Sequence, residues 1–292
     1  MAQKTSVCAL KGGVGKTDLL VQLAAAFARR KKRVLVVDLD PQMNATRRLG
    51  ITHDPSAPIL TAVEIIQSGE EGIGKQAVVR CGWVDADGTP MPEAEYIDVL
   101  PAREDLTNRE TESGHVGALF RLKKALRGWA DEEYDVVLFD TPPSLGHLTQ
   151  LALAASDDVL IPIEPSNDAV GGGFKTSQFV QAHAEDLGNP GLHVSGVVVS
   201  KYNPNLLEHR FQYDGARELF GELLWNPARL VKVGSTELQL PGWIPLRTRI
   251  NEASGAGAPV SAYRDASGRE VTAIYDAIAD LYIDKLLKGK AA

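Results

Sequence analysis

Apolar runs rich in β-branched residues alternate with segments of helical periodicity along the chain, and this alternation constrains the fold more than any other feature. Residues 34–37 are continuously apolar, which is typical of a strand covered on both faces. The pattern predicts strands at residues 5–10, 33–40, 96–102, 134–140, 158–165, 194–203 and 237–246. It predicts helices at residues 18–32, 60–69, 116–130, 148–156, 174–188, 214–224 and 270–287. We therefore expect an α/β fold with a doubly wound, mostly parallel sheet and helices on both faces.

Length and composition indicate a single domain of an ordinary globular kind. The chain has 292 residues and contains no repeat, low-complexity block or linker, so we predict one domain over residues 1–292. Residues 70–95 are polar and mixed, and DADGTPMPEAE (85–95) within them is interpreted as an exposed excursion. The net charge of −7 excludes a uniformly basic surface, so that nucleic-acid binding would need a local basic face.

The sequence also favours a cytoplasmic location. It has two cysteines, Cys8 and Cys81, which excludes a disulfide framework as the main source of stability. No apolar run approaches the ~18 residues of a membrane span. The first strand begins so close to Met1 that we expect no signal peptide.

A glycine-rich loop with the sequence KGGVGKT (11–17) connects the first strand to the first helix. Backbone N–H groups and a helix N-terminus in such a loop predict a phosphate-binding site. Its members are Gly12, Gly13, Val14, Gly15, Lys16 and Thr17. Lys16 is expected to reach the β- and γ-phosphates, and the Thr17 hydroxyl to bind Mg²⁺. The first glycine of the usual pattern falls on Leu10, so this loop is a variant, and it carries a second lysine, Lys11.

Three aspartates follow or end buried strands. Asp38 and Asp40 have the spacing of two that points side chains to one side, and Asp140 ends another apolar strand. Because open parallel sheets bind ligands at the carboxyl edge, these carboxylates are candidate site residues. A helix cap or turn is the alternative for each, and it applies most to Asp38.

Together these motifs resemble the ParA/MinD group of deviant Walker-motif ATPases, which are P-loop NTPases. The resemblance rests on KGGVGKT, on VVDLDPQMNAT (36–46) and on YDVVLFDTPPSLG (134–146), with further similarity at residues 157–172 and 244–264. It covers nearly the whole chain. The DLDPQ and NAT segments favour the ParA branch of DNA-segregation ATPases, in its small form without an N-terminal helix-turn-helix.

The resemblance implies an ATP-dependent partition ATPase that uses ATP and Mg²⁺ and hydrolyses ATP weakly by itself. Its ATP-bound homodimer is a sandwich that binds double-stranded DNA non-specifically, which makes the protein nucleoid-associated. A ParB-like partner stimulates hydrolysis and release. In this arrangement Lys16 serves its own nucleotide, whereas Lys11 crosses the interface to the phosphates of the partner subunit.

The resemblance also assigns roles to the carboxylates. Asp40 orients the attacking water and is thus catalytic together with the two lysines. Asp38 supports the Mg²⁺ shell or its loop, and Asp140 holds Mg²⁺ through water. Residues 141–146 form the switch that senses the γ-phosphate.

Two further parts of the nucleotide site are less sharply indicated. Tyr202 and Pro245 match in position the family segments that line the base, with packing as an equal alternative. The family commonly has a second hydroxyl residue after Thr17, near the α-phosphate, where this chain has Asp18. A carboxylate there is expected to repel the nucleotide by about 1 kcal/mol if solvated, or to stabilise the first helical turn instead.

DNA binding is predicted on the C-terminal half. Arg249 falls on a family arginine of this kind. Other candidates for the same patch are Arg247, Lys201, Arg210, Arg229 and Lys232. Phosphate contacts need no base readout and weaken with salt; scattered solvated charges are the alternative. The densest basic run, residues 28–34, is interpreted as a solvated helix end.

Other functions stay open. A MinD-like positioning ATPase would bind membrane through an amphipathic C-terminal tail, but we interpret residues 278–287 as core packing and expect no stable membrane binding. A ParA-like ATPase that positions a protein cargo is a further alternative. An iron protein of the nitrogenase type is discounted, because neither Cys8 nor Cys81 matches the cluster positions.

Overall fold

The computed structural model describes residues 1–233 and 236–287, and in this part of the chain one seven-stranded sheet forms the centre. The strand order is β3-β4-β2-β5-β1-β6-β7. The strands are β1 (Gln3–Val7), β2 (Val34–Asp38), β3 (Val79–Arg80), β4 (Ile97–Leu100), β5 (Val136–Asp140), β6 (Asp158–Ile163) and β7 (His193–Val199). All neighbours pair in parallel except β3 with β4, so the prediction of a mostly parallel sheet is confirmed.

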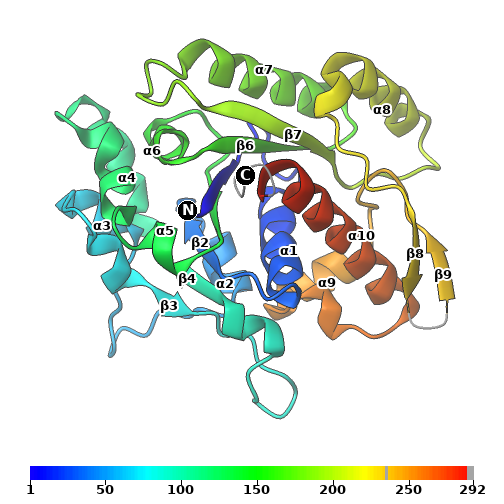
Figure 1. Ribbon diagram of the computed structural model, residues 1–292, viewed down its shortest axis with the longest axis horizontal. Coiled ribbons are helices and arrows are strands. Elements are labelled where there is room, and N and C mark those ends of the chain that lie inside the picture. The colour runs from blue at the N-terminus through cyan, green and yellow to red at the C-terminus, as the bar shows by residue number, and fades with distance from the viewer. Residues whose placement is uncertain (234–235, 288–292) are drawn as a thin grey trace.

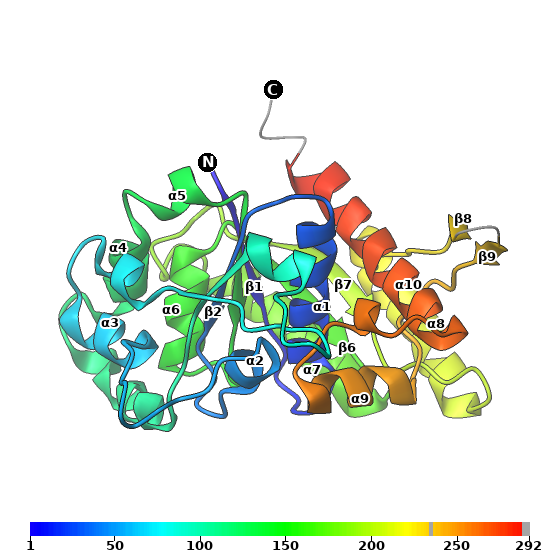
Figure 2. The same cartoon turned by 90° about the horizontal axis from the view of Figure 1, so that it is seen from below.

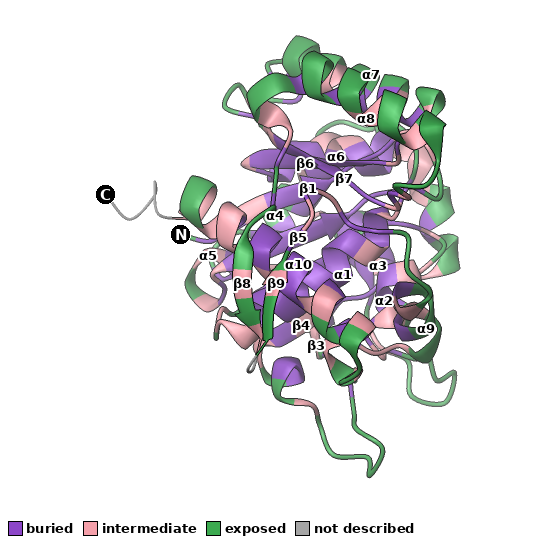
Figure 3. Ribbon diagram, turned by 90° about the vertical axis from the view of Figure 1, so that its right-hand side faces the viewer, coloured by how far each residue is buried: buried purple, intermediate pink, exposed green. Residues whose placement is uncertain are grey.

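Helices cover both faces of the sheet (Figures 1 and 2). They are α1 (Lys16–Arg29), α2 (Asn44–Arg48), α3 (Ala62–Ser68), α4 (Arg121–Leu126), α5 (Ala130–Glu133), α6 (His147–Ala155), α7 (Asn167–His183), α8 (Leu207–Phe220), α9 (Thr248–Ala256) and α10 (Ala266–Tyr282). Along β2, Val34 and Val36 pack on the side of α1 and α10, whereas Leu35 and Val37 pack on the side of α3, α4 and α6. This alternation explains why the apolar run is continuous. Figure 3 shows the buried sheet and the exposed outer surfaces of α7 and α8.

The strand order brings the predicted site together. β2, β5 and β1 are neighbours, and the Cα register places Asp38 opposite Asp140 and Val7 opposite Asp140. Parallel strands end at the same edge, so the loop after β1 and the aspartates after β2 and β5 share one edge of the sheet.

Several predicted boundaries were wrong. The helix predicted at 116–130 is divided, because Gly128 adopts a positive φ of 83° between α4 and α5. The strand predicted at 237–246 is divided: β9 (Thr236–Gln239) pairs with β8 (Leu230–Val233) in a separate two-stranded sheet, whereas residues 244–246 hydrogen-bond to Val199 and Tyr202 beside the end of β7. Helices α2 and α9 were not predicted. The edge strand β3 and a 3-10 turn at Ile73–Ala77 precede the predicted excursion, and a second 3-10 turn, Pro92–Tyr96, begins inside it.

The C-terminal helix is part of the core. Ile274, Ile278 and Tyr282 of α10 are buried, and the Tyr282 ring meets Phe27 of α1 edge-on at 4.8 Å between centroids. The interpretation of this helix as core packing is confirmed for the described residues; 288–292 lie outside them. No helix in the described ranges is long and apolar enough to cross a membrane.

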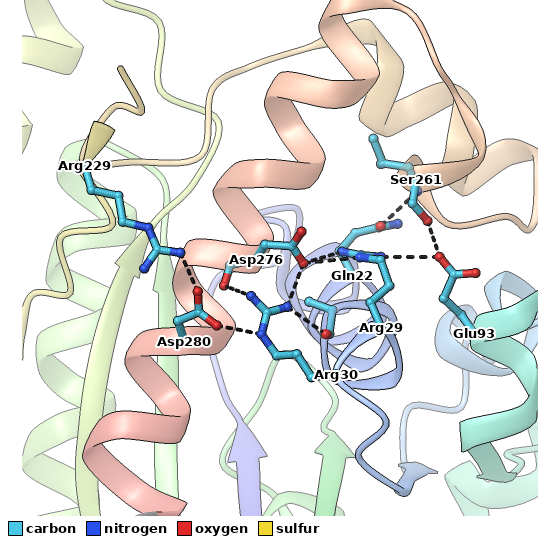
Figure 4. Close-up of polar contacts among 10 residues, drawn as sticks. Gln22, Arg29, Arg30, Glu93, Arg229, Ser261, Asp276 and Asp280 are labelled. Carbon is cyan, nitrogen blue, oxygen red and sulfur yellow. Dashed lines mark hydrogen bonds and ion pairs between the residues drawn. The ribbon is translucent and has the colours of Figure 1, made fainter. Parts of the chain in front are cut away.

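A polar cluster fastens α10 to the end of α1 (Figure 4). Arg30 donates hydrogen bonds to Asp276 at 2.8 Å and to Asp280 at 2.6 Å, and Arg29 donates to Asp276 at 2.8 Å. Arg229, just before β8, pairs with Asp280 as well. The prediction that the basic run at the end of α1 is a solvated helix end is therefore wrong for part of the run. Two of its arginines neutralise half-buried carboxylates that are remote in sequence.

Helix α7 begins at Asn167, well before the predicted start, and runs through three consecutive glycines. The sequence pattern predicted that the helix begins after them, at residue 174. The third glycine, Gly173, allows close packing on the sheet, since a Cβ at this position would lie 2.6 Å from Cγ2 of Ile163 in β6. A Cβ at Gly171 would meet nothing within 4 Å.

These two glycines give a matched test of this packing. We expect Gly173→Ala to lower the free energy of unfolding by about 1–3 kcal/mol, because the methyl group forces α7 away from β6. Gly171→Ala should raise it by about 0.5–1 kcal/mol, because the same change then only reduces the freedom of the unfolded chain. Urea denaturation of both variants measures the difference. Equal effects of the two substitutions would contradict the proposed close approach.

Candidate active site

Two side chains that directly follow β7 bind the backbone of the loop between β1 and α1. Gly13 and Gly15 both have a φ of 82°, a conformation that glycine adopts without a Cβ penalty. The Val14 side chain is buried, and its carbonyl accepts a hydrogen bond from the Ser200 hydroxyl at 2.5 Å. The Lys201 ammonium donates to the carbonyl of Gly13. The backbone of the loop is thus fixed by side chains on the segment after β7.

Lys16 and Thr17, the first residues of α1, both donate hydrogen bonds to Asp140 at the end of β5. Lys16 Nζ lies 2.8 Å from Oδ1, and Thr17 Oγ1 lies 2.8 Å from Oδ2. The Lys16 side chain is 8% exposed and that of Asp140 is 0% exposed. Burial lowers the pKa of Lys16, but the adjacent Asp140 carboxylate outweighs it, so that the pKa is raised and the ammonium is retained.

Asp38 is used to hold the loop that follows β2. It is fully buried, and its carboxylate accepts hydrogen bonds from the N–H of Asp40 at 3.0 Å, the N–H of Thr46 at 2.8 Å and the Thr46 hydroxyl at 2.7 Å. Burial and then the neighbouring Asp140 carboxylate raise the pKa of Asp38 to about 7. Both oxygens are occupied within the chain, which favours support of the loop over direct metal ligation.

Asp40 faces the cavity in front of the loop. Its Oδ2 lies 4.0 Å from Lys16 Nζ, and its Oδ1 accepts a hydrogen bond from the N–H of Gln42 at 2.9 Å. Burial raises the pKa of Asp40, although the Gln42 hydrogen bond and the Lys16 charge oppose the shift. A carboxylate with this environment is suited to accept or orient a proton.

Lys11, the second lysine of the loop, is placed differently from Lys16. It is half-buried, and its Nζ donates a hydrogen bond to the hydroxyl of Ser166 at 3.1 Å. Ser166 is the residue that precedes α7. The two lysines therefore occupy distinct environments, one paired with a buried carboxylate and the other with a neutral hydroxyl.

An open cavity of about 240 Å³ lies over the loop. Eight of the predicted residues line it: Lys11, Gly12, Gly13, Gly15, Lys16, Thr17, Asp18 and Asp40. Further lining residues are Gln42, Asn44, Arg48, Pro143 and Lys201. Of these, Gln42, Asn44 and Arg48 were not predicted as site residues, because they lie on α2 and the turn before it, which the sequence pattern did not indicate.

A second hollow adjoins the first where Gly15 and Asp18 meet the chain segment after β9. Pro245 lines it, with Ile244 and Ile250 beside it, so the predicted base contact is positioned next to the loop. The backbone of Tyr202 pairs with that of Pro245, but its ring belongs to an aromatic cluster, with ring centroids 4.2 Å from Trp243 and 5.5 Å from Tyr213. Tyr202 is 5% exposed, so packing explains its position better than base contact does.

The predicted DNA-binding residues do not form one free basic patch. Lys201 lies against the phosphate loop, as described. Arg249 pairs with Glu252 and Asp265, and its guanidinium lies 4.7 Å from the centroid of the Tyr263 ring.

The other candidates are also engaged within the chain. Arg247 pairs with Glu270 at 3.2 Å, and Arg210 donates to the carbonyl of Pro204 at 2.7 Å. Arg229 belongs to the α10 cluster, whereas the side chain of Lys232 is exposed.

Within the described residues, no group of three or more His, Cys, Asp and Glu side chains is arranged to hold a metal ion. Thr17 and Asp140 nevertheless present a hydroxyl and a carboxylate 2.8 Å apart beside the loop. Such oxygen atoms are the ligands that Mg²⁺ prefers, together with water and phosphate.

Comparisons with known proteins agree with this geometry. A family model described as an AAA domain matches residues 2–193. The chromosome partitioning protein ParA of Myxococcus xanthus is 37% identical over 194 residues, which are 66% of this chain and 62% of that protein. The sporulation initiation inhibitor protein Soj of Bacillus subtilis is 32% identical over 269 residues, which are 89% of this chain and 91% of that protein. Cobyrinic acid a,c-diamide synthase of Mycobacterium smegmatis, solved with bound ADP and magnesium, has a TM-score of 0.69 at 26% identity and covers 98% of this chain and 96% of its own.

The different environments of the two lysines predict different effects on stability. Lys16→Ala removes the counter-ion of a buried carboxylate, so the free energy of unfolding should fall by about 3 kcal/mol at pH 7. The Asp140 carboxylate then stays buried without its cation, which is the reason for the large loss. Urea denaturation of the variant and of wild type at pH 7 measures it.

Lys11→Ala is the matched control. It removes the same charge from the same loop but breaks one hydrogen bond to a neutral hydroxyl, so we expect a loss of about 1 kcal/mol or less. Equal losses for the two variants would show that the Lys16–Asp140 pair is not the element that stabilises this edge.

Proposed function

The chain belongs to the ParA/Soj group of P-loop ATPases, and from this premise we propose that it is an ATP-driven partition switch. ATP binding favours a sandwich homodimer that binds double-stranded DNA without sequence preference. A ParB-like partner on the cargo stimulates hydrolysis and releases the dimer from DNA. The observation that carries this proposal is the loop that bears two lysines, with Lys16 and Thr17 both directed at Asp140.

The residues of the loop suit a nucleotide with Mg²⁺. The backbone N–H groups of the loop and the N-terminus of α1 bind phosphate oxygens, and Lys16 adds a fixed positive charge. Thr17 and Asp140 would hold Mg²⁺, which neutralises charge on the β- and γ-phosphates when bound. Because Lys16, Thr17 and Asp140 are already within hydrogen-bond distance, little rearrangement of the chain is needed.

Asp40 is the proposed catalytic carboxylate. Its side chain lines the cavity between the loop and the turn after β2, and Asp38 fixes its backbone. In this position Asp40 can orient a water molecule toward the terminal phosphate, and burial raises its affinity for a proton. Slow hydrolysis without a partner is consistent with a site that lacks the second subunit's lysine.

Lys11 is proposed to supply that lysine in the homodimer. Its hydrogen bond to Ser166 is weak enough to be exchanged for a charge-assisted bond to a phosphate of the partner subunit's nucleotide. The neighbouring Gly12 and Gly13 are exposed, so a second subunit can approach this loop closely. Dimerisation and nucleotide binding are then coupled. The partner's lysine adds to the free energy of nucleotide binding, and the bound nucleotide adds to the free energy of dimerisation by the same amount.

DNA binding through Arg249 has to compete with carboxylates of the same chain. Arg249 pairs with Glu252 and Asp265, so a DNA phosphate must displace at least one of them. The binding is therefore expected to be weak per chain and to depend on the dimer and on low salt.

The first test is binding to random-sequence duplex DNA with ATP–Mg²⁺, with ADP–Mg²⁺ and without nucleotide, across a salt series. We expect salt-sensitive binding with ATP alone and its loss in Lys16→Ala. Arg249→Ala should reduce the slope of log affinity against log salt by about 2, one phosphate contact for each chain of the dimer. Glu252→Gln should strengthen binding several-fold, because it removes a competing carboxylate.

Arg127→Ala is the matched control, since Arg127 is an exposed arginine that pairs with Glu71 at a position remote from α9. Equal losses for Arg127→Ala and Arg249→Ala would contradict a specific patch. ATP hydrolysis without DNA binding in any state would contradict the DNA-dependent switch. It would favour a MinD-like membrane-surface ATPase or a positioner of protein cargo, which anionic liposomes distinguish.

A further inference from the structure

Asp18 introduces a carboxylate at the point where phosphates are expected to bind. It is the third residue of α1 and lines both the cavity over the loop and the adjoining hollow. A negative charge there opposes binding of a nucleotide, and it takes the place of a hydroxyl in the related ATPases. In the structure, two side chains donate hydrogen bonds to this carboxylate.

Arg48 neutralises the Asp18 carboxylate from the neighbouring helix. Its Nη1 donates to Asp18 Oδ1 at 2.7 Å, and the Ser254 hydroxyl of α9 donates to the same oxygen at 2.5 Å. The Asp18 and Arg48 side chains are 14% and 25% exposed, so the pair is partly withdrawn from solvent. The contact joins α1, α2 and α9 at the edge of the site.

A hydrogen bond to its backbone carbonyl fixes the position of Arg48. Arg48 is the last residue of α2, and its carbonyl accepts a hydrogen bond from Trp83 Nε1 at 2.7 Å. Trp83 is 1% exposed. The Arg48 side chain lines the same cavity as Lys11 and Lys16. A guanidinium that is held by one carboxylate still has N–H groups for a second anion, in a planar geometry that suits phosphate.

We propose that Arg48 is a phosphate-binding residue of the nucleotide site and that Asp18 is the positioning residue that holds its guanidinium. Asp18 and Arg48 together replace the hydroxyl after Thr17. This inference rests on the proposed function, because it concerns the same nucleotide. It assigns to α2 a contact that neither the loop motif nor the aspartates indicate.

Binding of ADP–Mg²⁺ to the full chain, measured by calorimetry, tests the inference without hydrolysis, DNA or a partner. Arg48→Ala should weaken binding about 100-fold, because a charged hydrogen bond is lost and the Asp18 carboxylate is left without its cation. Arg47→Ala is the matched control: it removes the same charge from the adjacent residue, which is exposed and does not line the cavity. Thermal unfolding of each variant confirms that it is folded.

Asp18→Ala separates a phosphate contact from simple neutralisation of charge. With Arg48 present, it should weaken ADP binding, because the guanidinium loses its support. In the Arg48→Ala background it should strengthen binding, because an unneutralised carboxylate is removed. This change of sign is not expected if Asp18 only stabilises the fold. Asp18→Ala/Arg48→Ala should still bind ADP about 10-fold less tightly than Asp18→Ala.

Equal ADP affinity of Asp18→Ala and Asp18→Ala/Arg48→Ala would overturn the inference, since Arg48 would then act on Asp18 alone. Wild-type affinity in Arg48→Ala would overturn it as well, while the proposed ATP-driven function would stand. A wild-type chain that does not bind ADP would instead contradict the proposed function, and this inference with it.

Discussion

The hydrogen-bonded ion pair between Lys16 and Asp140 is the interaction on which the site depends. It connects the first turn of α1 to the end of β5, and Thr17 joins the same carboxylate. A buried pair of this kind is stable only when both charges are present, so the loop and the end of β5 are linked electrostatically. Phosphates and Mg²⁺ that enter here exchange partners with charges already in place.

Around this pair, other charged side chains are bound by partners within the chain. Asp38 is occupied by the backbone and hydroxyl of its own loop, Asp18 by Arg48 and Ser254, and Arg249 by two carboxylates. The Asp38 contacts lie in the interior, whereas those of Asp18 and Arg249 lie nearer the surface.

Much of the fold and of the phosphate site could be predicted from the sequence, because both depend on local sequence patterns. Apolar runs gave the parallel strands, and the glycine and lysine spacing gave the loop. Tertiary contacts could not be predicted in this way. Gly173 lets α7 pack closely on Ile163 of β6, and the arginines at the end of α1 bind carboxylates of α10.

The same limit applied to individual site residues. Tyr202 had the position of a base contact in sequence, but its ring stacks on Trp243, and Arg48 was overlooked because nothing in the spacing connects it with Asp18. The departure at Asp18 indicated either repulsion of the nucleotide or support of the first helical turn. It did not indicate that an arginine of another helix pairs with this carboxylate.

The central claim is that Lys16 binds the chain's own nucleotide whereas Lys11 acts across a dimer interface. Sedimentation of wild type and Lys11→Ala with a non-hydrolysable ATP analogue and Mg²⁺ tests it most directly, with analogue affinity measured alongside. The account predicts a nucleotide-dependent dimer for wild type and a monomer for Lys11→Ala that still binds the analogue. A Lys11→Ala chain that dimerises like wild type would contradict the account.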